Sequence, residues 1–152
     1  MHSKIYTMTI KQGLKKKNRL ISQAEQAFNK THFYNSYRIE DFDKRPYSSK
    51  QSLDEYIQLT NELIMLKTKI QRANSPVYER IFRLSELKNM VVKMKKLDCE
   101  EGTQRNGWER EEKKKAEISV KEKDELIASM EKEIEEIQDQ LDEWNQVTTL
   151  PE

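Results

Sequence analysis

The sequence predicts an all-α fold: an antiparallel four-helix bundle, or coiled-coil-like helical hairpins with a long aromatic-rich connection. Apolar residues recur at spacings of three and four over four long stretches, which places them on one face of a helix. The chain has 152 residues but only three Gly and three Pro, too few for a many-stranded sandwich or barrel. We expect one helical domain over residues 1–152, with helices at about 9–30, 52–73, 76–97 and 119–146.

The first expected helix, 9–30, starts at Thr9, a residue type that caps helices. Gly13 costs this helix about 1 kcal/mol relative to Ala. It indicates either the close approach of a neighbour or a frayed first turn, and we favour the frayed turn. Lys17 interrupts the apolar face. The residues of that face are Ile10, Leu14, Leu20, Ile21, Ala24, Ala27 and Phe28.

Residues 31–50 are rich in aromatics and lack a helical period. Pro46 disfavours helical geometry at Arg45, so we expect a long connection across one end of the bundle, with a short strand near residues 37–39 as one option. Long aromatic connections are favoured places for binding. We predict an interaction surface in this connection. We add Trp108, the one large apolar residue of a later polar loop, to the same surface. Its residues are Phe33, Tyr34, Tyr37 and Trp108.

The second and third expected helices follow with almost no linker, which favours an antiparallel hairpin between them. Ser52 and Glu55 have the spacing of a capping box, and Asn74 is a residue type that ends helices in a left-handed cap. Pro76 suits the first helical position, although an extended segment over 77–83 is an alternative. The seam of the second helix is Tyr56, Leu59, Leu63, Leu66, Ile70 and Ala73. The seam of the third is Val77, Ile81, Leu84, Leu87, Val91 and Met94.

The last expected helix, 119–146, follows a polar loop that Gly102 and Gly107 punctuate. Ser119 and Glu122 have the spacing of a second capping box. About 27 residues make this helix roughly 40 Å long. We expect the tail after Gln146 to be loose. The seam residues are Ile127, Met130, Ile134, Ile137, Leu141 and Trp144.

Two stretches carry a family resemblance. The run from Leu66 to Asn74 contains an Ile-x-Arg-x-Asn helix end, and the run from Leu141 to Leu150 has a Trp, Asn and Thr-x-Leu ending. Together they resemble a family of small uncharacterised bacterial and phage proteins, some labelled septicolysin, although Trp144 and Asn145 stand in reversed order. The resemblance implies a helical cytoplasmic protein. It brings no established catalytic residue.

Charge is unevenly distributed although the net charge is only +1. Residues 1–50 contain 11 basic and 4 acidic groups, whereas residues 98–152 contain 8 and 18. The basic clusters therefore have two possible partners, phosphate groups or the acidic last helix. The cluster that we regard as a possible nucleic-acid contact is Lys11, Lys15, Lys16, Lys17 and Arg19.

No pattern in the sequence supports catalytic chemistry. His2 and His32 lack the Glu three residues earlier that a di-metal carboxylate site requires, and acids follow Cys99 without a His nearby. There is no Gly-rich phosphate loop. We therefore predict no enzyme, no catalytic residue, no metal and no cofactor. One cysteine and no visible signal peptide favour the cytoplasm, and no apolar run is long enough to span a membrane.

These observations favour a structural or protein-interaction module, a helical bundle that self-associates as a homo-oligomer and has no catalytic activity. Four narrow seams give a thin core, which association of two bundles would cover. A protein partner is also possible. The alternative is a nucleic-acid-binding protein that uses the lysine-rich first helix, and its phosphate contacts would need no sequence readout.

Overall fold

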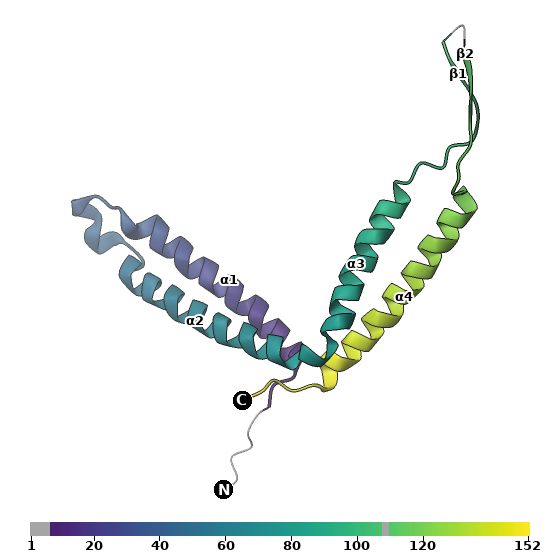
Figure 1. The fold of residues 1–152 in the computed structure, drawn as a ribbon. Coiled ribbons are helices and arrows are strands. Elements are labelled where there is room, and N and C mark those ends of the chain that lie inside the picture. The colour runs from purple at the N-terminus through teal and green to yellow at the C-terminus, as the bar shows by residue number, and fades with distance from the viewer. Residues whose placement is uncertain (1–6, 108–109) are drawn as a thin grey trace. The chain divides into compact units, whose positions relative to one another are not determined.

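The structure, a computed structural model, describes residues 7–107 and 110–152 (Figure 1). It is mostly helical, which confirms the predicted class, but it also contains a small two-stranded sheet. In chain order the elements are α1 (Ile10–Asn35), η1 (Ile39–Lys44), α2 (Ser49–Ala73), η2 (Ser75–Val77), α3 (Tyr78–Lys95), β1 (Gly102–Asn106), β2 (Arg110–Lys114) and α4 (Val120–Val147).

The chain divides into two compact units. Unit 1 is Met1–Pro76 with Trp144–Glu152, and unit 2 is Val77–Glu143. Each unit holds two of the long helices, so neither contains a four-helix bundle by itself. Helix α2 packs along α1 in unit 1 and α3 belongs to unit 2, so the antiparallel pairing of the second and third helices stays a prediction. The single domain over residues 1–152 stays a prediction.

Unit 1 is built on the antiparallel hairpin of α1 and α2. Gly13 lies beside Ile70 near one end, and the rings of Phe28 and Tyr56 are 5.2 Å apart near the other. Small residues occupy much of the seam between the helices, because they follow the three-and-four spacing that faces a partner helix. The small buried residues are Gly13, Ala24 and Ala27 of α1 and Ser49 and Ser52 of α2.

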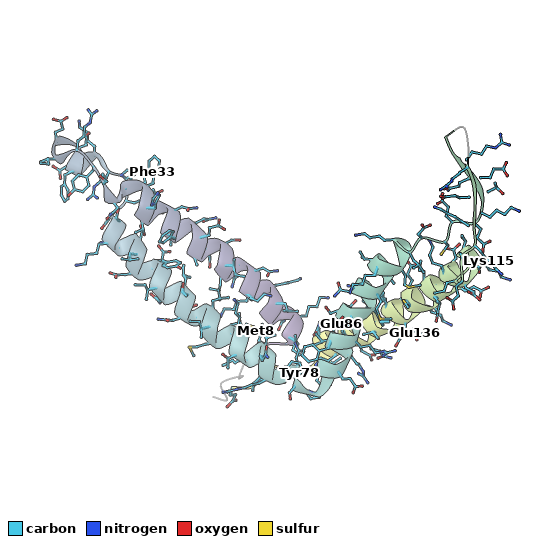
Figure 2. All side chains as sticks on the ribbon, turned by 45° about the horizontal axis from the view of Figure 1, so that its top comes forward. Met8, Phe33, Tyr78, Glu86, Lys115 and Glu136 are labelled. Carbon is cyan, nitrogen blue, oxygen red and sulfur yellow. The ribbon has the colours of Figure 1, made fainter. Side chains whose placement is uncertain are left out.

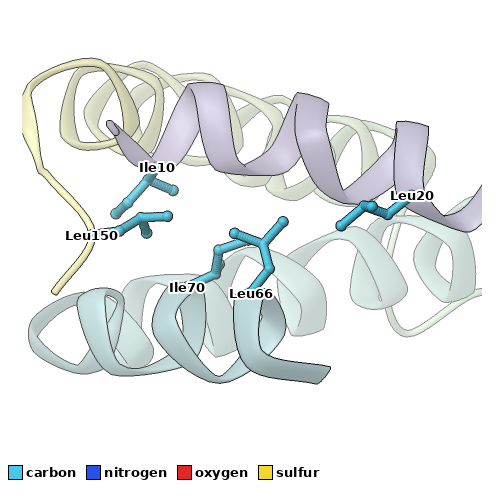
Figure 3. Close-up of a cluster of buried hydrophobic side chains, with 5 residues drawn as sticks. All are labelled: Ile10, Leu20, Leu66, Ile70 and Leu150. Atoms are coloured by element: carbon cyan, nitrogen blue, oxygen red, sulfur yellow. The ribbon is translucent and has the colours of Figure 1, made fainter. Parts of the chain in front are cut away.

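The C-terminal segment completes the core of this hairpin, so the expectation of a loose tail is wrong. The Ile10 amide donates to the Thr148 carbonyl at 2.9 Å, and the Leu150 amide donates to the Met8 carbonyl at 2.8 Å. These two bonds place Leu150 against Ile10 in a buried apolar cluster (Figure 3). The tail is ordered because its one large apolar side chain has a site to fill. The cluster is Ile10, Leu20, Leu66, Ile70 and Leu150.

The space that the Leu150 side chain fills exists because residue 13 is a glycine. A Cβ at Gly13 would lie 2.8 Å from Leu150 Cδ1 and 3.5 Å from Ile70 Cγ1, so the absence of a side chain leaves the space that Leu150 fills. Of the two interpretations of Gly13, close approach of a neighbour is correct and the frayed turn is wrong. Thr9 caps α1 as predicted, and its partner in a capping box is Gln12.

The start and end of α2 differ from the prediction. Ser48 is the N-cap and accepts a hydrogen bond from the Gln51 amide at 3.4 Å, whereas Ser52 lies buried inside the helix. The helix begins earlier because Ser48 offers the same capping hydroxyl four residues before Ser52. Asn74 ends α2 in right-handed geometry, with φ −84° and ψ −4°, because the chain turns directly into η2.

The connection between α1 and α2 is shorter than predicted. Helix α1 continues to Asn35, and η1 occupies Ile39–Lys44, so the optional strand at 37–39 is wrong. Further along the chain, η2 ends at Val77 and α3 begins at Tyr78, which also makes the extended alternative for 77–83 wrong.

Unit 2 contains α3, a β-hairpin and α4 up to Glu143 (Figure 1). Two ion pairs join the helices: Arg83 with Glu133, and Lys95 with Glu131 at 3.2 Å. The hydrogen bond to Glu133 raises the pKa of the Arg83 guanidinium. Two cations of α3 therefore pair with acids of α4, whereas the predicted basic cluster of Lys11, Lys15, Lys16, Lys17 and Arg19 lies on α1.

The loop between these helices is a β-hairpin, which the sequence did not predict. Strands β1 and β2 are antiparallel, with Gly102 opposite Lys114, and Gly107 at φ 75° lies in the turn. Polar residues fill the hairpin, so the alternation that signals a half-buried strand is missing. The Ser119 and Glu122 capping box at the start of α4 is confirmed, with bonds of 3.1 and 3.2 Å.

The buried C-terminal cluster generates a stability prediction. We expect Leu150→Ala to lower the free energy of unfolding of unit 1 by about 2–5 kcal/mol, because it empties a buried site that the backbone hydrogen bonds hold in place. Urea denaturation followed by circular dichroism measures this change. Val147→Ala, at an exposed residue of the same segment, is the control and should change stability by less than about 0.5 kcal/mol. Equal effects of both substitutions would contradict the assignment.

Candidate interaction surfaces

The aromatic end of the α1–α2 hairpin is built around Arg45. Its guanidinium carbon lies 4.0 Å from the ring centre of Tyr37 and 4.9 Å from that of Phe42. The same guanidinium donates to the Tyr34 carbonyl at 3.0 Å, which ties the connection to the end of α1. Sequence reasoning did not single out Arg45 for this role. The aromatic residues on either side of Arg45 in the sequence, Phe42 and Tyr47, were the signal that could have indicated this role.

This end exposes large apolar side chains. Phe33 is 75% exposed and Ile39 is 93% exposed, and Figure 2 shows Phe33 where α1 approaches the connection. Tyr37 and Phe42 are also exposed, whereas Tyr34 is half-buried between the rings of Phe33 and Tyr47. Three of the four predicted interaction residues therefore lie together. The fourth, Trp108, lies outside the described residues.

The predicted basic cluster lies toward the other end of α1. Lys11, Lys15 and Arg19 are exposed and spaced by four residues, so they form one row, while Lys16 and Lys17 are half-buried beside it. Within the part of the chain that the structure describes, none of these five side chains forms an ion pair or a hydrogen bond. The helix α2 adds Lys67 and Lys69 at the same end, which sequence reasoning missed because they lie far away in the chain.

The basic cluster and the aromatic end are separate surfaces. Lys15 and Phe33 are 18 residues apart on one continuous helix, which corresponds to about 27 Å at 1.5 Å per residue. Base stacking on the aromatic residues and phosphate contacts by the lysines would therefore not occur at one compact site.

A third surface is an exposed apolar strip along the side of the hairpin. On α1, Ile21 and Phe28 come directly after seam residues and are seven positions apart, so they share one side of the helix. On α2, Ile57 and Ile64 also come directly after seam residues. In an antiparallel pair these positions fall on the same side of both helices. We define the apolar flank as Ile21, Phe28, Leu53, Ile57 and Ile64.

The opposite side of the hairpin is charged. A groove of about 520 Å³ lies there, and its lining combines Lys16, Glu62 and Lys69 with a larger apolar part, Met8, Met65, Leu66, Leu150 and Pro151. We call Lys16, Glu62, Met65 and Lys69 the charged flank. One broad side of unit 1 is thus apolar at its centre, and the other carries ionic groups.

Unit 2 exposes apolar residues as well, including Phe82 and Met90 on α3. At the base of its β-hairpin, Lys114 donates to Glu100 at 3.0 Å, and this bond raises the pKa of the lysine. Cys99 beside it is buried and free. Among the described residues, no three His, Cys, Asp or Glu side chains gather as metal ligands would, and no helix is long and apolar enough to cross a membrane.

Comparison with known proteins finds no matching family model, no similar curated protein and no similar solved structure. The resemblance to the septicolysin-labelled family stays an expectation, and the surfaces themselves carry the functional argument.

The Arg45 cluster generates a prediction. We expect Arg45→Ala to lower the free energy of unfolding by about 1–2 kcal/mol and to speed amide exchange in residues 36–47, because two ring contacts and a backbone hydrogen bond are lost. Hydrogen–deuterium exchange and urea denaturation measure both effects. Arg38→Ala is the matched control, since Arg38 has only a 4.0 Å surface contact with Glu40. Faster exchange in the Arg38 variant alone would contradict this role for Arg45.

Proposed function

We propose that this protein is a non-catalytic helical module that acts through protein interaction and self-associates through unit 1. One observation supports the proposal most directly: the α1–α2 hairpin leaves five large apolar side chains exposed along one side, although small residues occupy part of its seam. Ala24 and Ala27 are buried in the seam, whereas Ile21 and Phe28 lie outside it.

The energetic reason lies in the unit's thin core. The large buried side chains of the core cluster among the described residues of unit 1 are Ile10, Leu20, Leu66, Ile70 and Leu150. Burial of apolar area contributes about 25 cal/mol per Å², so small seam residues provide little stabilisation, and the exposed flank holds area that could still be buried. A second hairpin packed on this flank would give each helix two neighbours. Four helices arranged in this way would form an intermolecular bundle, different from the bundle of four helices within one chain that the sequence predicts.

The proposed compartment is the cytoplasm. The protein has a single cysteine, Cys99, which is free and buried. Its stability therefore does not depend on oxidation, which suits a reducing compartment. A scaffold of this kind would serve as an assembly element, and the exposed aromatic end beyond the hairpin would remain available for a protein partner.

The test of this proposal is the molar mass in solution. We expect light scattering coupled to size-exclusion chromatography to give a molar mass at least twice that of the 18.2 kDa chain. This molar mass should fall toward that of the single chain on dilution. The physical reason is that mass action opposes association as concentration falls. A constant 18.2 kDa across the whole accessible concentration range would refute the proposal.

Nucleic-acid binding is a second candidate, and the unpaired cluster on α1 favours it. Lys11, Lys15 and Arg19 face solvent without acidic partners among the described residues, and Lys67 and Lys69 extend the positive surface. Such cations neutralise phosphates and release counterions, so the affinity would fall steeply with salt.

Anisotropy titrations with labelled DNA and RNA at low and rising salt test this candidate. We expect binding that weakens linearly on a logarithmic salt scale, and a double variant, Lys15→Glu with Arg19→Glu, whose salt slope is smaller by about two. Lys44→Glu is the control, because Lys44 lies beside the aromatic end and pairs with Asp41 at 3.1 Å. Absence of binding at low salt would eliminate the candidate.

A further inference from the structure

The apolar flank is a surface to which both helices of unit 1 contribute. Gly13 lies level with Ile70, and Phe28 lies level with Tyr56, so Ile21 falls level with Leu63 near the middle of the hairpin. Ile64 follows Leu63 directly and therefore also lies near this middle level. The strip thus has its centre at Ile21 and Ile64 and continues to Phe28 and Ile57 toward the aromatic end.

We propose that a second copy of this chain docks on the apolar flank, face to face and with its helices reversed, so that α1 lies over α1 and α2 over α2 of the other copy. This inference rests on the proposed self-association and adds the surface and the orientation. The resulting interface is isologous, because a two-fold axis at the level of Ile21 and Ile64 brings the same strip of each copy together.

The amount of apolar surface suits a second copy. Each of the five flank side chains is between 38% and 57% exposed, which amounts to a patch on the order of 400 Å² and matches the largest patches that monomers display. Two such patches supply about 800 Å² of apolar surface, so polar border residues would have to add about 400 Å² for a specific interface of roughly 1,200 Å².

Charge decides the orientation. The basic cluster of α1, with Lys67 and Lys69, gathers at the end of the hairpin near Ile10. Two copies docked in the same direction would bring both basic ends together, and like charges at an interface are strongly unfavourable. Reversed copies keep the basic ends apart. They also bring the basic end of each copy toward the half of the other copy that contains Glu25, an exposed acid without an ion pair among the described residues.

The chain offers a matched pair of residues for the test. Ile64 and Met65 are neighbours on α2 and are similarly exposed, at 57% and 62%, but Ile64 belongs to the apolar flank and Met65 to the charged flank. We expect Ile64→Glu to raise the dimer dissociation constant by roughly 30-fold or more, as the loss of a central contact does. Met65→Glu should change it by less than about threefold. Sedimentation equilibrium measures both constants, and circular dichroism verifies that each variant keeps its helical content.

Cysteine cross-linking of the full chain tests the orientation independently of affinity. In a Cys99→Ser background, Ile64→Cys should form a covalent dimer under mild oxidation, because reversed copies place the two Ile64 positions close to the two-fold axis. Ile57→Cys lies on the same flank, but its two copies would be about 18 Å apart along the helix direction and should not cross-link. Met65→Cys faces away from the interface and should also remain monomeric on a denaturing gel.

The outcomes separate this inference from the proposed function. A wild-type dimer that Ile64→Glu dissociates and Met65→Glu does not, with cross-linking at position 64 alone, supports the inference. A wild-type dimer that survives Ile64→Glu overturns the surface but leaves self-association standing. Cross-linking at position 57 instead of 64 overturns the orientation. A wild-type protein that is always monomeric overturns the proposed function, and the inference with it.

Discussion

The narrow seam between α1 and α2 is the constraint on which the rest of unit 1 depends. Glycine, alanine and serine occupy five of the buried helix positions, and Ile10, Leu20, Leu66 and Ile70 occupy the others, so only part of the seam holds large side chains. Ile21, Phe28 and the isoleucines of α2 occupy the side of the hairpin. The exposed apolar flank accompanies the small size of these seam residues.

Gly13 and Leu150 show how the same constraint is relieved at one end. Without a Cβ at Gly13, a large side chain from a distant part of the chain enters between the helices and contacts both Ile10 and Ile70. The backbone hydrogen bonds at Met8 and Ile10 then hold that segment in place. The flank residues Ile21, Phe28, Ile57 and Ile64 have no comparable cover among the described residues, since each stays 41–57% exposed.

The helices were predictable because their apolar spacing is regular over many turns, and the caps at Thr9 and Ser119 were recognisable by their residue types. The β-hairpin was not, because its strands are polar, and the docking of Leu150 was not, because a single apolar residue in a polar tail has no period. Ser48 and Ser52 are chemically equal as caps, so residue type could not decide between them. For the candidate surfaces, the aromatic and basic residues were found from the sequence, but the separation of the two sides of the hairpin required the helix register.

The bond between Met8 and Leu150 joins residues that are 142 positions apart in the chain, which affects how the protein is made. During translation α1 and α2 are synthesised well before Leu150, the side chain that completes their core, which follows the end of α2 by 77 residues. Chains are made at roughly 5–20 residues per second, so the hairpin spends several seconds with an open apolar gap at Gly13. Nascent chains in this interval would be the form most exposed to chaperones, proteases and premature contacts with one another.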